Sequence, residues 1–388
     1  MTPTDRRTNI IRAAALIVVS LSFAQIAVAH HGGGTFDGSK EIVLTGKLTR
    51  LDLVNPHSWI YFDVTDKDGK ISAHRCEMRA ATVLRRSGWT KEMFRAGQRI
   101  TIQGSPDRVD PNSCYLNTII LEDGSRADRY GQFTKPAIAA TKRPARRPNG
   151  DLNISGDWAP EQLVMTDPRG RRGALVPLSR LNQFQPGEGR IGGPPAAGRG
   201  GPQRYRGAEL TEVGEKAAAN IGTFAPKDNP RMRCETTSII FDWTFDGPVN
   251  RITQNKDTIV LQYGQMGFTR TVHMNMTTHP ATVKPSRAGH SIGRWNNDVL
   301  IVDTVGFAPG VLSPPVLNSD QLHVVEGFAL DPKAMVLMRS YVAEDPVYFK
   351  GHYAGSDTIQ VADLPYAPDK CTELGFVDYS KEGQRPKR

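Results

Sequence analysis

Beyond residue 29, this chain of 388 residues contains no apolar run that approaches the roughly 20 residues needed to span a membrane. We therefore expect no transmembrane span. The chain has only four cysteines and no C-x-x-C pair, which argues against a thioredoxin-like site or a zinc ribbon. Aromatic residues make up only 7% of the sequence. The chain therefore has few aromatic residues to form the exposed aromatic surface with which polysaccharide-active copper enzymes bind their substrate.

The first 29 residues have the parts of a secretory signal peptide in the expected order. Arg6, Arg7 and Arg12 precede an apolar run over 13–24, and small residues lead to a cleavage site after Ala29. We expect the mature chain to begin at His30 and to be periplasmic or secreted. The Arg6-Arg7 pair also raises the twin-arginine route, but the residues after it fit that signal imperfectly, which favours the general secretory route.

The charge of the chain is basic. Removal of residues 1–29 takes away three Arg and one Asp, so the net charge falls from +9 to +7. Outside the cytoplasm such a charge meets envelope polymers and acidic partners rather than nucleic acid, so we expect a small molecule or an envelope component as partner. Much of the surplus lies in residues 130–207, which we interpret as a Pro/Gly-rich linker with one short-strand candidate at 154–158.

Residues 30–129 predict a small OB-like β-barrel. Alternating apolar residues and turn signals give three strands, a helix and two further strands, which is the element order of an OB-like barrel. The expected strands cover 41–54, 57–64, 71–78, 98–104 and 115–121, and the helix covers 79–87.

Residues 208–380 predict a second β domain, either an antiparallel barrel of calycin type or a curved sheet. A helix is expected over 209–220. In addition, Gly156-x-Trp158 resembles the Gly-x-Trp of lipocalin-type barrels, in which the Trp closes one end of the barrel. The expected strands are 237–245, 249–254, 258–263, 268–275, 298–305, 322–330, 335–343 and 347–353.

The cysteines are divided between the two domains. Export permits disulfides, and four cysteines allow three connectivities. Because two cysteines fall in each half of the chain, we expect one bridge within each domain, Cys76–Cys114 and Cys234–Cys371.

The mature N-terminus offers a candidate metal site. His30 would carry both an α-amine and an imidazole, with His57 as a further ligand, His74 as its rival and Glu77 nearby. This nitrogen-rich set suits Cu(II). Such a histidine brace is the basis for copper-dependent oxidation as an alternative function, whereas the structural alternative is a simple flexible terminus.

Three further patterns carry weaker signals. Residues 289–293 fit G-x-S-x-G, but a strand rather than a helix is expected to follow, so the context of a nucleophile elbow is missing. Residues 273–279 contain soft copper ligands, although methionines on one strand face are more typical of a core. No spacing identifies an acid/base pair among the later acidic and histidine residues, Asp303, His323, Glu326, Glu344 and Asp345.

Two stretches resemble uncharacterised families of exported bacterial proteins. The first covers roughly residues 29–124 and shows, in order, Ala29-His30-His31, Phe36-Asp37, Leu44-Thr-Gly46, Asn55-Pro56-His57, the stretch 84–89 and Asp123-Gly124. The second is carried by Gly289-His-Ser-Ile-Gly-Arg-Trp295, Leu300-Ile-Val-Asp-Thr304 and Gly306-Phe307. Both resemblances imply export and a domain layout, and neither implies an activity.

The sequence thus predicts an exported protein that binds rather than catalyses. The leading hypothesis is a small apolar ligand in the C-terminal barrel, with a metal held at the N-terminal histidine. The alternatives are copper-dependent oxidation and a scaffold that binds envelope polymers through positive charge. No residue is assigned a catalytic role.

Overall fold

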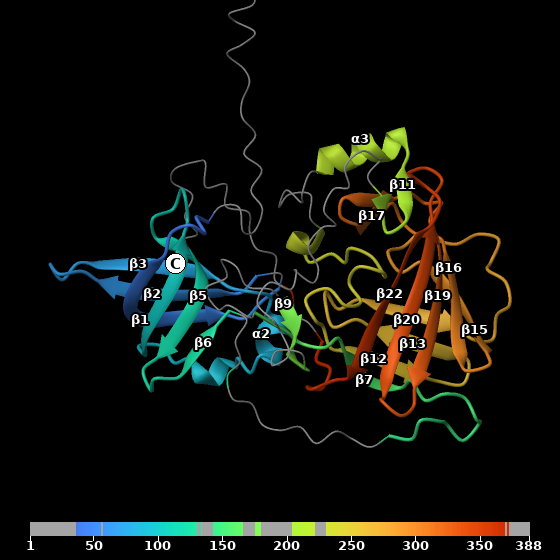
Figure 1. Ribbon diagram of the computed structural model, residues 1–388, viewed down its shortest axis with the longest axis horizontal. Helices are drawn as coiled ribbons and strands as arrows, with labels where there is room; N and C mark the ends of the chain where they lie inside the picture. Colours follow the sequence, from blue (N-terminus) through green and yellow to red (C-terminus); the bar gives the residue numbers. More distant parts are fainter. Residues whose placement is uncertain are drawn as a thin grey trace, which may run out of the picture.

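The computed structural model describes residues 36–55, 57–129, 133, 143–165, 175–179, 204–221, 230–368 and 371. It is mainly β, as expected, with one barrel in each half of the chain. Figure 1 shows the N-terminal barrel in blue and cyan beside the C-terminal barrel in orange and red. In the part of the chain that the structure describes, no helix has both the length and the hydropathy to cross a membrane.

The N-terminal barrel has the predicted order of three strands, a helix and two strands. Its sheet runs β3-β2-β1-β4-β5-β6, and a parallel pairing of β3 with β5 closes it. The elements are β1 (Ile42–Asp52), β2 (Trp59–Thr65), β3 (Ile71–Glu77), α2 (Ala81–Arg86), a 3-10 turn η2 (Lys91–Met93), β4 (Arg99–Pro106), β5 (Ser113–Leu121) and β6 (Arg126–Asp128).

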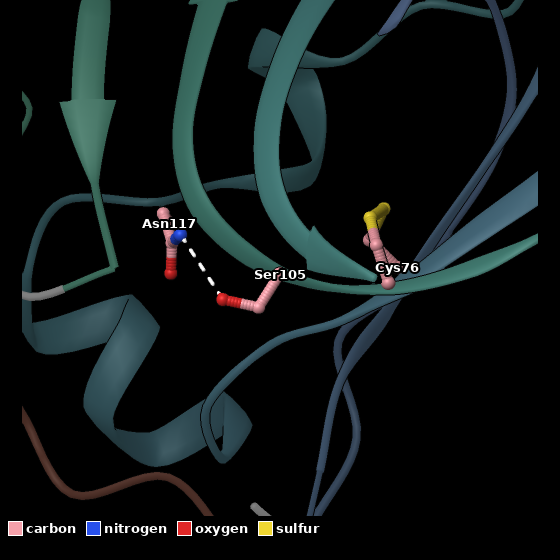
Figure 2. Close-up of a disulfide and its surroundings, with 4 residues drawn as sticks. Cys76, Ser105 and Asn117 are labelled. Carbon is pink, nitrogen blue, oxygen red and sulfur yellow. Dashed lines mark hydrogen bonds between the residues drawn. A yellow bond between two sulfur atoms is a disulfide. The ribbon is translucent and has the colours of Figure 1, made fainter. Parts of the chain in front are cut away.

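The first disulfide lies where this barrel closes. Cys76 on β3 is in register with Cys114 on β5, and the two are bonded as predicted. Gly104 packs against the bridge, because a Cβ there would lie 2.9 Å from the Cys114 sulfur. On the next strand the Asn117 amide donates to the Ser105 hydroxyl at 3.3 Å (Figure 2). The closure of the barrel therefore depends on one covalent link and a glycine that makes room for it.

The C-terminal barrel has nine strands in the order β12-β13-β14-β15-β16-β19-β20-β22-β7. Neighbouring strands are antiparallel except β14 and β15, which are parallel, so the chain must cross over between them. The strands are β7 (Gly156–Ala159), β12 (Asn250–Gln254), β13 (Thr258–Gln262), β14 (Thr269–His273), β15 (His290–Asn296), β16 (Val299–Val305), β19 (His323–Asp331), β20 (Val336–Glu344) and β22 (Tyr353–Val361).

The short strand expected in the basic linker is present as β7, and it belongs to the C-terminal barrel. It pairs with β12 on one side and β22 on the other. Trp158 is fully buried, donates to the Ile154 carbonyl at 2.8 Å and lies under the Arg143 guanidinium. The part of the expected linker from Leu152 to Ala159 is therefore packed in this barrel, whose sheet β7 closes.

Two predicted strands are wrong. Over 347–353 only the two-residue β21 (Phe349–Lys350) forms, and β22, which the sequence did not predict, begins at Tyr353. Instead of the strand expected over 237–245, residues 239–246 form consecutive turns, with Ile239, Ile240 and Trp243 buried. The Asp242 carboxylate accepts the backbone N–H of Thr237 at 2.6 Å, and such local side-chain bonds offer the backbone an alternative to a strand. We name residues 237–246 the plug. The sequence also missed β15, where a turn was expected to precede a strand.

The remaining elements surround the C-terminal barrel. The helix predicted over 209–220 is α3 (Glu212–Ile221), which Thr211 caps by accepting the Gly214 N–H at 3.0 Å. The others are β8 (Leu163–Met165), β9 (Leu175–Pro177), β10 (Arg204–Tyr205), β11 (Ala208–Leu210), a 3-10 turn η5 (Pro230–Arg233), β17 (Gly310–Ser313), β18 (Val316–Asn318) and β21 (Phe349–Lys350).

Helix α2 connects the two barrels. The Arg86 side chain is buried and donates to the carbonyls of Pro160 at 2.7 Å and Gly247 at 2.9 Å, and to Asp363 at 3.0 Å. The second predicted disulfide, Cys234–Cys371, is also present, and its Cys371 sulfur lies 3.1 Å from the Asn55 carbonyl of the N-terminal barrel. The barrels therefore meet through specific polar contacts.

Candidate functional site

Side chains fill the interior of the C-terminal barrel. Arg270 and Arg339 are both buried and share the Glu326 carboxylate, while Arg339 also pairs with Asp357. Burial acts to lower the pKa of both guanidinium groups, but the adjacent carboxylates outweigh it and hold each pKa above its ordinary value. Burial also raises the pKa of Tyr263, which lies beside them, to about 12. The interior is thus charged and tightly paired rather than an apolar void.

The plug covers this charged interior. Its carbonyl of Ile239 accepts hydrogen bonds from Arg339 at 2.9 Å and from the Tyr263 hydroxyl at 3.0 Å. The ring of Trp243 packs edge-on against Tyr263 at 5.0 Å between centroids. The plug therefore packs on the buried ion pairs, and we call the space between it and Tyr341, Tyr353 and Asp357 the mouth of the barrel.

A pocket of about 150 Å3 lies at that mouth. A cavity of about this size accommodates one benzene-sized ring. Its wall combines aromatic rings with hydroxyl groups and two charged side chains. The lining residues are Arg206, Ile240, Phe241, Thr244, Phe245, Ser313, Tyr341, Tyr353, Ser356 and Asp357.

The two charged side chains of this pocket differ in whether they have an ion-pair partner. Asp357 is neutralised by Arg339, whereas Arg206 has no carboxylate partner among the described residues and lies 6.0 Å from the centre of the Tyr341 ring. Burial raises the pKa of Tyr341, although the Arg206 charge opposes that shift, so its hydroxyl stays protonated at neutral pH. Gly355 leaves the space for both, because a Cβ there would lie 2.5 Å from the Tyr341 hydroxyl. Among the described residues, the pocket therefore has one positive charge, that of Arg206, without a carboxylate partner.

The predicted N-terminal metal ligands are only partly within the described residues. His30 lies outside them. His57 lies just before β2, and its Nδ1 is hydrogen-bonded to the Glu77 carboxylate. Burial acts to lower the pKa of His57, but the Glu77 charge and hydrogen bond, together with Asp246 of the plug, raise it overall. His57 thus sits where the two barrels meet.

His74 lies well away from His57. It pairs with Phe62, five residues beyond His57 along the neighbouring strand, which is roughly 15 Å at the rise of a β-strand. Its ring stacks on Phe62, and burial lowers its pKa despite the nearby Asp110 and Asp63. The register therefore separates the two rival ligands.

The G-x-S-x-G stretch forms no nucleophile elbow. Ser291 lies on β15 with its side chain fully buried inside the barrel, hydrogen-bonded to Thr304 at 2.9 Å and to Arg270 at 3.1 Å. Gly289 has a φ of +64°, and a Cβ there would lie 2.8 Å from the Val305 carbonyl. These contacts confirm the backbone role that the sequence context indicated for the glycine.

A group of four histidines and one aspartate, which the sequence did not connect, lies on the outer wall of the C-terminal barrel. His279 Nε2 and His323 Nε2 lie 3.1 and 3.0 Å from the same oxygen of Asp303. His279 Nδ1 lies 2.8 Å from His290 Nδ1, and the His290 ring stacks on His273 with centroids 5.0 Å apart. We name these five residues the histidine cluster.

Comparison with known proteins finds a match for only one part of this two-barrel β protein. Residues 17–114 match the model of a family of unknown function (DUF6152), which overlaps the stretch where the first resemblance was predicted. No curated protein and no solved structure matches the chain. The second resemblance and the predicted signal peptide stay predictions, while the two disulfides are compatible with export.

Proposed function

We propose that this protein is an exported binding protein whose ligand occupies the mouth of the C-terminal barrel. The observation that carries this proposal is the Arg206 guanidinium, which has no carboxylate partner among the described residues and lies at a pocket lined by four aromatic rings. The ligand is a small molecule with an anionic group for Arg206 and a planar apolar body for the rings. This modifies the apolar ligand expected from the sequence, because the interior beneath the pocket is charged.

The charge balance supports an anionic ligand. Arg206, Arg270 and Arg339 face two carboxylates, Glu326 and Asp357, which leaves one net positive charge at and below the pocket. Arg206 is the exposed member of this group, whereas Arg270, Arg339 and Glu326 are buried beneath it. The hydroxyls of Tyr341, Tyr353 and Ser356 supply further hydrogen bonds.

Titration with benzoate and with benzyl alcohol tests the proposal, because the two probes share a ring and differ in charge. We expect benzoate to bind more tightly to the full mature chain. Arg206→Gln should weaken benzoate about 10-fold, since a hydrogen bond to a charged group contributes about 1.5–3 kcal/mol. It should leave benzyl alcohol unchanged. Arg294→Gln on the exposed outer face of β15 is the matched control. Equal benzoate affinity for Arg206→Gln and the parent protein would contradict the proposal.

One contact in the structure, the hydrogen bond between His57 and Glu77, supports the copper hypothesis. A histidine that ligates a metal commonly donates its other ring N–H to a carboxylate, and Glu77 takes that part for His57, leaving Nε2 available. With His30 as the first mature residue, an added N-terminal residue should weaken Cu(II) binding strongly. Equal Cu(II) affinity for the native and extended chains, measured by calorimetry, would end this hypothesis.

A further inference from the structure

The histidine cluster gathers residues from four neighbouring strands onto one face. Side chains alternate in and out along a strand, so the buried Val272, Ser291, Thr304 and Val324 point inward and the residues next to them point outward. Those outward neighbours are His273 on β14, His290 on β15, Asp303 on β16 and His323 on β19.

The strand register brings these outward residues within reach of each other. Asp303 pairs with Ile292 on one side and with Val325 on the other. His290 and His323 are two residues from these partners, which makes them diagonal neighbours of Asp303 on the same face. The distance between diagonal neighbours is too long for small side chains to touch, but imidazole rings can span it.

The fifth residue comes from the crossover that the parallel β14–β15 pair requires. Residues 274–289 leave the end of β14 and return to the start of β15, and His279 lies within them. Backbone bonds hold both ends of this segment: Met274 N–H donates to Asp257 at 2.8 Å and Ala308 N–H donates to Ser286 at 2.8 Å. His279 is thereby placed over Asp303 with 18% of its side chain exposed.

We propose that His279, Asp303 and His323 bind a divalent first-row transition metal ion, with His290 positioning His279. Two imidazoles and one carboxylate are ligands that Zn²⁺ and its neighbours in the series accept. Tetrahedral Zn²⁺ sets its ligand atoms about 3.4 Å apart, whereas ligand atoms about 2.1 Å from an octahedral ion and at right angles to each other are about 3.0 Å apart. The two Nε2–Oδ1 distances of 3.1 and 3.0 Å match that edge.

In the described part of the chain, no three His, Cys, Asp or Glu side chains are already arranged around a metal position. Here the two imidazoles instead donate their Nε2 protons to Asp303. A cation that replaces them requires each proton to move to Nδ1 of the same ring, with no change in net charge. His279 Nδ1–H can then donate to His290 Nδ1, which lies 2.8 Å away, once the His290 proton has moved to its own Nε2. His323 has 39% of its side chain exposed, so its ring is free to move until its Nε2 lies at ligand distance from His279 Nε2.

The direct test is calorimetric titration of the full mature chain with Zn²⁺ at pH 7.5. We expect one ion to bind at this site, and Asp303→Asn and His323→Ala each to weaken it at least 10-fold. His352→Ala is the matched control, because His352 also pairs with a carboxylate, Glu344, but stands exposed and alone. His57→Ala serves to separate this site from the N-terminal one.

A second readout guards against a folding defect. Zn²⁺ should raise the melting temperature of the parent chain and of His352→Ala, and should leave that of Asp303→Asn unchanged, while near-UV circular dichroism of the three proteins agrees. Zn²⁺ binding to Asp303→Asn with the parent affinity would overturn the proposal. So would loss of binding in His57→Ala alone, or the absence of any binding below millimolar Zn²⁺. Benzoate binding at the barrel mouth is unaffected by these outcomes.

Discussion

The Arg339 guanidinium donates a hydrogen bond of 2.9 Å to the backbone carbonyl of Ile239. Arg339 belongs to the barrel wall and Ile239 to the plug, so this bond ties an irregular segment to a regular one. The same guanidinium holds Glu326 and Asp357. One buried charge therefore determines both where the plug lies and how two carboxylates are neutralised.

Replacing Arg339 by Met should strongly destabilise the C-terminal barrel. The change leaves Asp357 without its partner and leaves Glu326 with Arg270 alone, and removal of one member of a buried ion pair costs about 3–5 kcal/mol. The free energy of unfolding in urea measures the effect. Arg294→Met, at an exposed position of β15, should change it by less than about 0.5 kcal/mol. Similar values for the two variants would show that Arg339 does not hold the plug.

Replacing Arg86 by Ala should weaken the contact between the barrels. It leaves the carbonyls of Pro160 and Gly247 unpaired, and each buried unsatisfied group costs about 1–3 kcal/mol. The loss should be visible in urea unfolding and in faster cleavage by trypsin. Arg85→Ala is the control, since Arg85 is its neighbour on α2 and is less buried. Equal stability of the two variants would contradict the assignment.

The His57–Glu77 pair should make stability depend on pH. The folded pKa of His57 is raised, so the stability that the pair contributes is fully present below the unfolded pKa of about 6.5 and is lost as pH rises through the folded value. Unfolding free energies between pH 5.5 and 8.5 should therefore fall more steeply in the parent than in Glu77→Gln. Glu344→Gln, in an exposed pair with His352, should behave like the parent.

The two disulfides should contribute different amounts to the free energy of unfolding, because they close loops of different length. Separations of 38 and 137 residues correspond to about 4 kcal/mol and about 5 kcal/mol of stabilisation in the chain-entropy model. We expect the Cys234→Ala/Cys371→Ala protein to unfold at lower urea than the Cys76→Ala/Cys114→Ala protein. Labelling of the unreduced, denatured parent should find no free thiol. Detection of four thiols would show that neither bridge forms in the isolated protein.

Local patterns were sufficient for much of the fold. The strands of the N-terminal barrel follow from alternating apolar residues, and Thr211 marks the start of α3 because its hydroxyl caps the first turn. The strand at Trp158 was visible from its short motif, but its role in closing the barrel was not. Pairing of β7 with β12 joins residues about ninety positions apart, and no local pattern encodes such a partner.

The plug shows where composition misleads. Residues 237–245 are rich in the β-branched and aromatic side chains typical of a strand, yet Asp242 binds Thr236 and Thr237 and turns the chain. The pattern and the side-chain bonds compete for the same backbone groups, and burial of Trp243 in the barrel decides in favour of the turns.

The sequence by itself determined the β character of both halves, the even division of the cysteines and the basic middle segment, because these depend on composition and on neighbours along the chain. The tertiary structure alone decided the histidine cluster and the pocket at the barrel mouth. His279, Asp303 and His323 are 20 or more residues apart and meet only because a parallel strand pair forces a crossover above an outer wall. Arg206 likewise reaches Tyr341 across more than a hundred residues. Such contacts arise from sheet register and barrel closure, which no single segment specifies.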